Sequence, residues 1–377
     1  MDKLMLGESG LCGRAGENFN PIVVAQMASA FAVWLKQRQA PHRPGRLRVL
    51  TGRDAHASSA WVRDAAAAAL AASGIEVLDL DVVTTAGAAM MVKHMNADAA
   101  MLARADDRPI PSNAIRLLGS DGLDMAQEHV SDILRLYESN AAAFVSPDQT
   151  LARSANSETH AVHVKRVLAR LDVLGISCKR FKVALDTVNG AACIVAPTIL
   201  SKLGCRLSHI NATPDGRFPH EPEPRPENLA ALCQEVRRQK ADVGFALDAT
   251  GQRLGIVDQQ GACIGPEYPL AIAAFVTLAK KQGVLVCDEA AAGALDAVAG
   301  ACGGRVIRAP GGLGAVARAM IESHAVIGGS GDGSVIDSRI GPAPDATVAM
   351  AYVLQAMAHA SKTVSQIVEQ IASTASH

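Results

Sequence analysis

The chain has 377 residues, a length that suits two or three domains of ordinary size. Its 36 basic and 37 acidic side chains leave a formal net charge of -1, so no basic excess can neutralise phosphates across a nucleic-acid or anionic-membrane surface. No stretch approaches the ~18 uninterrupted apolar residues of a membrane span, and the N-terminus lacks a basic and apolar leader pattern. We therefore expect a cytoplasmic protein that binds neither nucleic acid nor membrane.

A strand-helix-strand unit recurs three times along the chain. The first strands are predicted at 47–51, 182–185 and 284–287, the following helices end near 73, 203 and 301, and the closing strands lie at 76–80, 206–210 and 305–308. Each copy is followed by another strand that opens into a polar or Gly-rich loop, at 104–113, 248–253 and 328–334. This pattern predicts tandem α/β/α domains with mixed, mostly parallel sheets. Ligands are expected at these loops, because they follow the carboxyl ends of strands.

Two irregular stretches suggest where the domains meet. The chain is polar and Ser-rich around 146–158, and a second break is predicted near 261–266. We therefore place the domains at 1–150, 151–262 and 263–377, with a helix over 362–373 near the end of the third. Residues 211–226 contain five prolines and are predicted to form an ordered loop without helix or central strand.

Eight cysteines are scattered through the chain without a Cys-x-x-Cys pair or a histidine at zinc-binding spacing. They are Cys12, Cys178, Cys193, Cys205, Cys233, Cys263, Cys287 and Cys302. We interpret them as buried or incidental thiols of a protein in a reducing compartment.

Three motifs carry a resemblance to a known family. They are Gly52-Arg53-Asp54 before an Ala-rich helix, Asn189-Gly190-Ala191 after Asp186, and the long run Asn-Ala-Thr-Pro-Asp-Gly-Arg-Phe-Pro at 211–219. Together they resemble the α-D-phosphohexomutase superfamily, which includes phosphoglucomutase, phosphomannomutase and phosphoglucosamine mutase. The likeness extends from Gly7 to nearly the end of the chain. It implies three phosphohexomutase-type α/β/α domains in a row.

Members of that superfamily move a phosphoryl group between sugar positions with a phosphoserine, a magnesium ion and a bisphosphorylated intermediate. The resemblance places Asp106 at the serine position of the nucleophile loop. An aspartate carries about one negative charge against roughly -1.5 to -2 for phosphoserine, and it has no phosphoryl group to transfer. We expect Asp106 to be inactive. The alternative is that its carboxylate accepts a phosphoryl group with help from a metal.

The superfamily's magnesium loop carries three carboxylates in an Asp-Gly-Asp-x-Asp-Arg sequence. The corresponding residues here are Asp248, Thr250, Gln252 and Arg253, so one carboxylate remains among the three metal-ligand positions. Because Mg²⁺ is a hard cation that favours carboxylates and phosphates, we predict an empty metal loop and no cofactor. Mg²⁺ is expected as a cofactor only if Asp106 accepts a phosphoryl group.

The sugar-recognition loop of the superfamily corresponds to residues 328–334, where Ser330 and Asp332 replace the usual Glu and Ser. Arg253 and Arg14 are further candidate substrate-binding residues, and Arg14 stands two residues after the position of the family's N-terminal arginine, which is Cys12 here. Without a P-loop or dinucleotide fingerprint, the glycines of 328–334 are interpreted as a flexible loop between domains.

The resemblance ends with the third domain, so we expect the fourth, phosphate-binding domain of the superfamily to be absent. The altered motifs together predict a catalytically degenerate homologue, a pseudoenzyme with a binding, regulatory or assembly role in sugar-phosphate or polysaccharide metabolism. A sugar phosphate is the expected ligand, and self-association or a partner protein is expected to cover the surface left by the fourth domain. The alternative is a divergent mutase that acts on glucose, mannose or glucosamine phosphates through Asp106.

Overall fold

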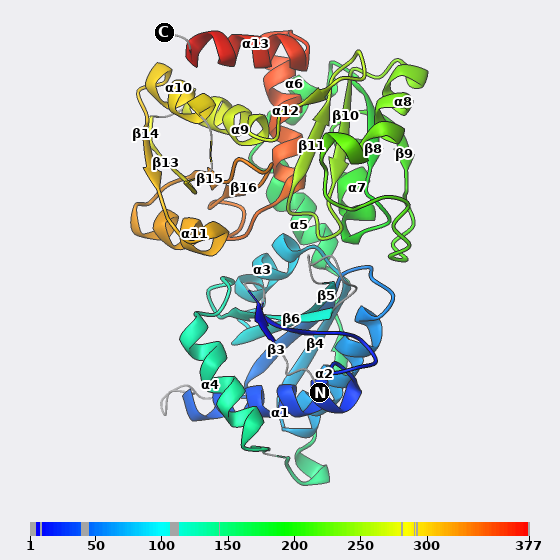
Figure 1. Cartoon of the computed structure of the whole chain (residues 1–377), viewed down its shortest axis with the longest axis vertical. Helices are drawn as coiled ribbons and strands as arrows, with labels where there is room; N and C mark the ends of the chain where they lie inside the picture. Colours follow the sequence, from blue (N-terminus) through cyan, green and yellow to red (C-terminus); the bar gives the residue numbers. More distant parts are fainter. Residues whose placement is uncertain are drawn as a thin grey trace. The chain divides into compact units, whose positions relative to one another are not determined.

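The predicted repeats fold as three β-sheets flanked by helices in a computed structural model of the chain, which confirms the expected α/β class (Figure 1). The structure describes residues 5–7, 10–38, 45–105, 113–142, 144–279, 282–289, 291 and 293–375. The chain forms two compact units. The first consists of Met1–Val83 and Gly87–Thr159, and the second consists of Thr84–Ala86 and His160–His377. The first contains one sheet and the second contains two.

The first unit is built on a seven-stranded sheet in the order β1-β2-β6-β5-β3-β4-β7. Strands β3, β4, β5 and β7 run parallel, while β1, β2 and β6 pair antiparallel at one side. Its elements are β1 (Met5–Gly7), β2 (Gly10–Gly13), α1 (Pro21–Arg38), β3 (Arg48–Arg53), α2 (Ser59–Ala72), β4 (Glu76–Val82), α3 (Thr85–His94), β5 (Ala99–Ala105), β6 (Asn113–Gly119), α4 (Gln127–Glu138) and β7 (Arg153–Ala155).

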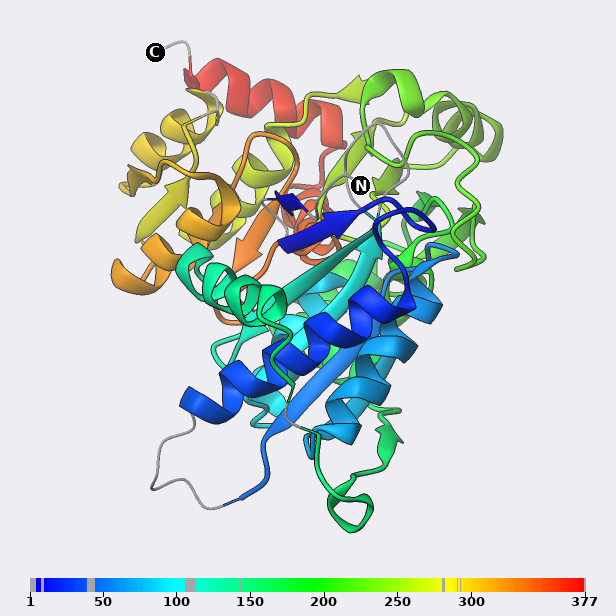
Figure 2. The ribbon, with the colours of Figure 1, turned by 60° about the horizontal axis from the view of Figure 1, so that its bottom comes forward.

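Small side chains let the helices of this unit approach closely. The Ala-rich α2 packs beside α1, and α1 also contacts α4, as Figure 2 shows for α1 and α2 in front of the sheet. One buried cluster joins these three helices to the inner strands and includes Phe31, Val62 and Leu70. Trp34 is buried in the same cluster.

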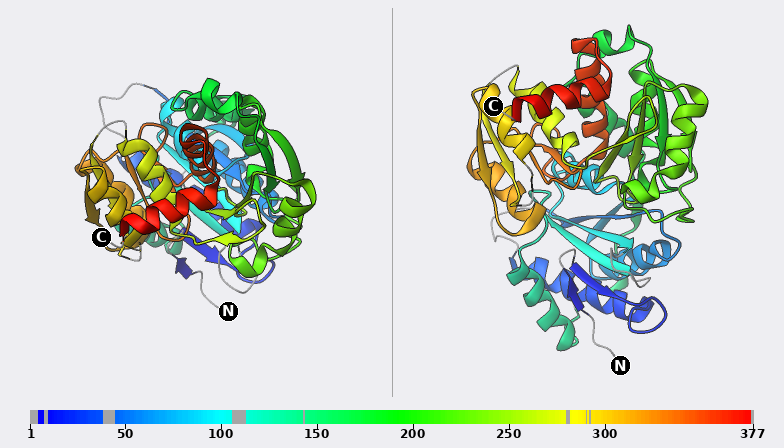
Figure 3. Two further views of the ribbon diagram at one scale, coloured as in Figure 1. Left: turned by 90° about the horizontal axis from the view of Figure 1, so that it is seen from above. Right: turned by 45° about the horizontal axis from the view of Figure 1, so that its top comes forward.

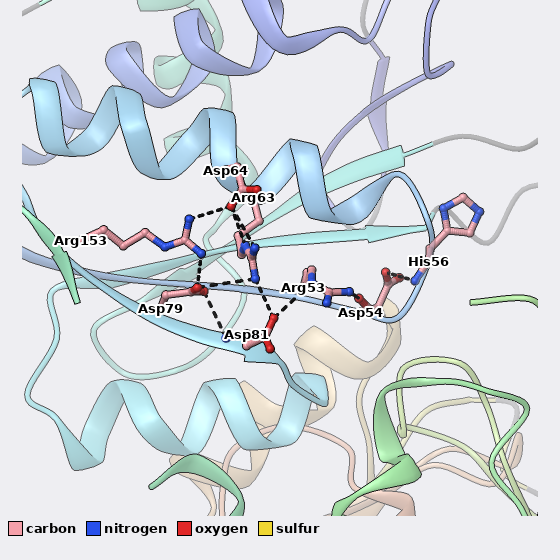
Figure 4. Close-up of polar contacts among 8 residues, drawn as sticks. All are labelled: Arg53, Asp54, His56, Arg63, Asp64, Asp79, Asp81 and Arg153. Carbon is pink, nitrogen blue, oxygen red and sulfur yellow. Dashed lines mark hydrogen bonds and ion pairs between the residues drawn. The ribbon is translucent and has the colours of Figure 1, made fainter. Parts of the chain in front are cut away.

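A network of arginines and aspartates ties β4, α2 and β7 together (Figure 4). Arg63 on α2 lies 2.7 Å from Asp81 and 3.5 Å from Asp79. Arg153 on β7 contacts Asp79 and, at 2.6 Å, Asp64. Asp81 has a φ of +53° where the pairing of β3 with β4 shifts register. The two arginines therefore hold a strained bend and a short edge strand in place.

The second unit contains the other two sheets, with five strands in the order β12-β11-β10-β8-β9 and four in the order β14-β13-β15-β16. The elements around the first are α5 (Thr159–Leu168), α6 (Val173–Ser177), β8 (Lys182–Asp186), α7 (Val195–Lys202), β9 (Arg206–Ile210), α8 (Ala230–Gln239), β10 (Val243–Leu247), β11 (Leu254–Val257) and β12 (Cys263–Ile264). Those around the second are α9 (Tyr268–Leu278), β13 (Val284–Cys287), α10 (Gly293–Ala301), β14 (Arg305–Arg308), α11 (Gly312–Glu322), β15 (Ile327–Gly329), β16 (Val335–Asp337), α12 (Ala346–Ala360) and α13 (Val364–Ala375).

Helix α12 packs between the two sheets of this unit. It contacts β11, α6 and α7 on one side and β16 and α9 on the other (Figure 1), and it is buried from Ala346 to Ala358. An apolar helix of this kind suits a protein interior. At the end of the chain, α13 packs on α10 and α9 (Figure 3). Within the described ranges, every helix is too short or too polar to cross a bilayer.

Candidate functional site

The loop between β10 and β11 contains the residues predicted at the magnesium position. β10 is a fully buried apolar strand, parallel to β8 and antiparallel to β11, so residues 248–253 connect a hairpin at the carboxyl end of a parallel strand. Gly251 has a φ of +73°, a left-handed conformation that favours glycine. The sequence therefore specifies the turn locally.

Asp248 is buried at the start of this loop, with 8% of the residue exposed. Its Oδ1 accepts hydrogen bonds from the backbone amides of Gln252 (2.6 Å) and Arg253 (3.2 Å), and its Oδ2 accepts one from the Thr250 hydroxyl (2.9 Å). Burial raises the pKa of Asp248 more than Arg253 and these hydrogen bonds lower it. The Asp248 carboxylate thus holds the turn together through hydrogen bonds to three of its residues.

The donor set at this position does not suit a tight magnesium site. The Thr250 hydroxyl lies 2.9 Å from Asp248 Oδ2 and 3.1 Å from Gln252 Oε1, so one hydroxyl bridges the two other side chains. Mg²⁺ requires several hard oxygen ligands near 2.1 Å and prefers carboxylates. Only one carboxylate is present among these three side chains, and no cluster of three His, Cys, Asp or Glu residues suited to a metal occurs in the described part of the chain.

Arg253, the last residue of the loop, is paired with the predicted sugar-recognition loop. Its Nε donates to Asp332 Oδ2 at 2.8 Å. Asp332 Oδ1 accepts from the Ser334 amide at 3.0 Å, and its own amide donates to the Ser330 hydroxyl at 3.4 Å. Burial alone would raise the pKa of Asp332, but the Arg253 guanidinium and the Ser334 amide hold it below its usual value. An ion pair therefore joins the two loops.

Residues 328–334 are not the flexible interdomain loop that their glycines suggested. They form the end of β15 and the turn into the antiparallel β16, closed by a hydrogen bond from the Ser330 amide to the Ser334 carbonyl. Gly333 has a φ of +95°, and a Cβ there would lie 2.5 Å from the carbonyl oxygen of Leu254. Glycine is thus needed for close approach between two backbones, which also bond through the Leu254 amide and the Gly333 carbonyl.

The start of α12 completes this site. The Ala346 amide donates to the Gly251 carbonyl at 3.0 Å, so a helix N-terminus is bonded directly to the turn that holds Asp248. Asp345, the N-cap of α12, accepts from the Thr347 amide and contacts the buried His163 of α5 at 2.6 Å. Burial raises the pKa of Asp345, but the positive charge of His163 and the Thr347 hydrogen bonds outweigh that effect and lower it.

A second polar cluster lies after β8 and was not predicted as a site. Asp186 is buried and accepts from the Val188 amide and, through both of its oxygens at 3.0 Å, from the Asn211 side-chain amide. His220 lies 3.1 Å from Asp186 through Nε2 and 2.8 Å from the Glu221 carbonyl through Nδ1. Both partners are hydrogen-bond acceptors, so the His220 ring links the Asp186 carboxylate to the backbone at Glu221. The signal in the sequence was an aspartate placed after β8 as Asp248 is placed after β10.

Two predicted site residues are not among the described residues of the second unit. Asp106 lies outside the described residues. Arg14 belongs to the first unit, where its amide donates to the Asn18 side chain at 2.7 Å and its guanidinium lies 3.6 Å from Glu17 on an exposed turn. The structure thus brings together six predicted residues in the second unit, namely Asp248, Thr250, Gln252, Arg253, Ser330 and Asp332.

Models of three family domains match most of the chain. They describe phosphoglucomutase/phosphomannomutase α/β/α domains I, II and III, and they match residues 3–144, 161–261 and 266–374. Among similar proteins, a phosphoglucomutase/phosphomannomutase of Thermococcus kodakarensis is 29% identical over 97% of this chain and 80% of its own length. A probable phosphoglucosamine mutase of Methanopyrus kandleri is 30% identical over 97% of this chain and 79% of its own length.

Solved structures show the same fold. A putative phosphomannomutase from Thermus thermophilus superposes with a TM-score of 0.89 at 22% identity, over 99% of this chain and 84% of that one. A phosphoglucomutase/phosphomannomutase family protein from Burkholderia thailandensis gives a TM-score of 0.83 at 21% identity, over 97% of this chain and 80% of that one. The arrangement of three α/β/α domains predicted from the repeats is therefore shared with proteins of known structure.

Proposed function

Because the chain belongs to the phosphoglucomutase/phosphomannomutase family of α-D-phosphohexomutases, we propose that it binds a phosphorylated hexose without catalysing magnesium-dependent phosphoryl transfer. In this role the protein is a catalytically degenerate member of the family. It senses or carries a sugar phosphate, or presents one to a partner, in sugar-phosphate or polysaccharide metabolism.

One observation carries the proposal, the bridging contacts of Thr250. Its hydroxyl lies 2.9 Å from Asp248 Oδ2 and 3.1 Å from Gln252 Oε1, so a neutral group with a single hydrogen occupies the position between these two oxygens. Phosphoryl transfer depends on positioning and on stabilising the charge of the transferring group, to which metal ions contribute strongly. A loop with one buried carboxylate and two neutral side chains supplies little of that stabilisation.

The same site retains groups suited to recognising a sugar phosphate. Arg253 contributes a guanidinium whose planar fork matches phosphate oxygens, and Asp332 and Ser330 are side chains of the kind that hydrogen-bond sugar hydroxyls. The Arg253–Asp332 pair holds these groups in fixed positions before a ligand arrives. We expect selective binding with an affinity limited by the competition of Asp332 for Arg253.

A second candidate is a divergent hexose-phosphate mutase that uses Asp106 as phosphoryl acceptor on glucose, mannose or glucosamine phosphates. The similar proteins favour it, since those of Thermococcus kodakarensis and Methanopyrus kandleri carry mutase names and match nearly the whole chain. In this role Mg²⁺ would be required, with ligands supplied largely by the substrate's phosphates.

A coupled mutase assay separates the two candidates. Glucose 1-phosphate, mannose 1-phosphate and glucosamine 1-phosphate are each supplied with Mg²⁺ and the matching bisphosphate, while calorimetry measures binding of the same sugars with Mg²⁺ or with EDTA. The binding role predicts no turnover and equal affinity in both buffers. Turnover that is lost in Asp106→Ala but kept in the neighbouring control Asp107→Ala would establish the mutase instead. Neither turnover nor binding would overturn both.

A further inference from the structure

Two cysteine sulfurs meet beside the candidate site. Cys233 on α8 and Cys263 at the start of β12 are 30 residues apart in sequence, and their Sγ atoms are 3.6 Å apart. Within the described residues, no other pair of cysteine sulfurs is recorded at contact distance. The sequence predicted eight buried or incidental thiols, because no two of the cysteines form a Cys-x-x-Cys pair.

The surroundings allow these sulfurs to approach further. Cys233 is buried, with 8% exposure, in the cluster that joins α8 to β10 and β11. Cys263 is partly exposed on the two-residue strand β12, which pairs with β11 at the edge of the five-stranded sheet. A disulfide requires sulfurs about 2.05 Å apart, so a shift of roughly 1.5 Å is needed. A short edge strand with loops on both sides can yield by that amount more easily than a central strand.

We propose that Cys233 and Cys263 form a reversible disulfide by exchange with a small-molecule disulfide such as oxidised glutathione. The Cys263 thiolate attacks one sulfur of the oxidant, which forms a mixed disulfide and releases one thiol. The Cys233 thiolate then attacks the Cys263 sulfur, which closes the protein disulfide and releases the second thiol. The protein loses two electrons and two protons, and the oxidant gains both as two thiols.

The two sulfurs differ in exposure to solvent, and this difference determines which one reacts first. Cys263 is the sulfur that a solvent-borne oxidant reaches, and Cys233, behind it in the core, is placed to resolve the mixed disulfide. Burial and the neighbouring Cys233 raise the pKa of Cys263 to about 11. The thiolate fraction at neutral pH is therefore small, and the exchange is slow compared with that of an activated redox thiol.

Closing this bond changes the wall of a small cavity next to the candidate site. The cavity holds about 110 Å³, and its lining includes Cys263, Glu223, Arg225 and Asp332. Asp332 is the residue that pairs with Arg253. A disulfide fixes β12 against α8 and so restricts one wall of the cavity that Asp332 also lines. This consequence for ligand binding rests on the proposed function, whereas the disulfide itself does not.

The experiment uses the full chain, first reduced and then incubated with oxidised glutathione. Free thiols are blocked with N-ethylmaleimide, and peptides are mapped by mass spectrometry without reduction. We expect a peptide pair that joins Cys233 to Cys263, two hydrogens lighter than the reduced pair, and a melting temperature raised by on the order of 5 °C. Dithiothreitol should reverse both changes.

Three variants decide the outcome. Cys233→Ser and Cys263→Ser should each lose the linked peptides and the rise in melting temperature, while Cys178→Ser, at an exposed cysteine of the same unit, should keep both. Glutathione that stays on Cys263 of the wild-type chain, or a disulfide between other cysteines, would overturn the proposal. Hexose-phosphate affinity is measured separately on the oxidised and reduced chains, so the absence of sugar binding does not affect the disulfide result.

Discussion

Arg253 and Asp332 are 79 residues apart in sequence, yet the Nε of one donates to the Oδ2 of the other at 2.8 Å. The pair joins the loop after β10 to the hairpin of β15 and β16, and Arg253 also forms a β-bridge with Ser334. The guanidinium of Arg253, a candidate substrate-binding group, is thus paired with a carboxylate of the same chain. Several measurable consequences follow from this arrangement and from the turn that precedes it.

Removing the carboxylate should strengthen anion binding. In Asp332→Asn the side chain keeps its shape, but Arg253 no longer shares its charge with a carboxylate, so we expect hexose-phosphate affinity to rise by about fivefold to tenfold. Stability should fall by about 1 kcal/mol. Calorimetry and urea unfolding measure these quantities. The control is Asp296→Asn, which breaks the exposed pair with Arg308 and should leave affinity unchanged; an equal gain in the control would contradict the prediction.

Restoring the family's charges should create a magnesium site. The double variant Thr250→Asp with Gln252→Asp adds two carboxylates beside Asp248, where their repulsion destabilises the protein until a cation binds. We expect millimolar Mg²⁺ to raise its melting temperature by on the order of 5 °C. The matched variant Thr250→Asn with Gln252→Asn, of the same size but uncharged, should show no such shift. A comparable shift in the wild-type chain would mean that its loop already holds Mg²⁺.

The buried pair of His163 and Asp345 should make the free energy of unfolding depend on pH. Because the pKa of Asp345 is lowered in the folded protein, its contribution is complete above its unfolded value near 3.9 and is lost as pH falls through the lower folded value. Asp345→Asn should lower the free energy of unfolding by about 3 kcal/mol near pH 6. The difference in this free energy between the variant and wild type should become smaller below about pH 4. Urea unfolding between pH 3 and 7 measures it. A difference that stays constant with pH would show that Asp345 acts only as a helix cap.

Gly333 should not tolerate a side chain. In Gly333→Ala the new Cβ would lie 2.5 Å from the Leu254 carbonyl oxygen at a φ of +95°, so we expect a loss of about 2 kcal/mol or more. Gly314→Ala is the control, because that glycine is on α11 and a Cβ there would meet only the end of the Arg318 side chain, at 3.8 Å. There alanine should stabilise by about 0.5–1 kcal/mol. Thermal unfolding of both variants tests the contrast, and equal effects would refute it.

In the first unit, Arg63 should contribute more to the free energy of unfolding than an ordinary surface arginine does. It is largely buried and contacts Asp64, Asp79 and Asp81, so Arg63→Met leaves three carboxylates with less compensation and should cost about 2–3 kcal/mol. Arg135→Met removes an exposed arginine from α4 and should cost less than about 0.5 kcal/mol. Urea unfolding at low and high salt compares them. Similar losses for both variants would mean that the network in Figure 4 adds no stability.

The fold was largely predictable because strands and helices depend on local patterns. The expected strands at 206–210 and 305–308 coincide with β9 and β14, since short aliphatic or alternating runs between turn residues identify them. The helix expected over 362–373 is α13, Val364–Ala375, so each of its ends lies two residues later than predicted. Helix boundaries are harder to predict because tight turns at their ends use similar residues.

The site was predictable only in parts. The two loops were located because each follows a strand, and the family resemblance is confirmed by the matches to its three domains. Which atoms pair across the loops was not predictable, because the contacts between Arg253 and Asp332 and between Cys233 and Cys263 depend on how distant elements pack. The inactivity of Asp106 and the empty metal loop remain predictions.

The hydrogen bond from Ala346 to Gly251 has a consequence for how the protein unfolds. Helix α12 is buried between two sheets, and its first turn is bonded to the loop of one sheet while β16 of the other precedes it in the chain. Neither sheet can separate from α12 without exposing an apolar helix surface to water. Amide hydrogens of β10 and β13 should therefore exchange through one shared opening event, and a ligand bound at the loops should slow exchange in both sheets to the same extent.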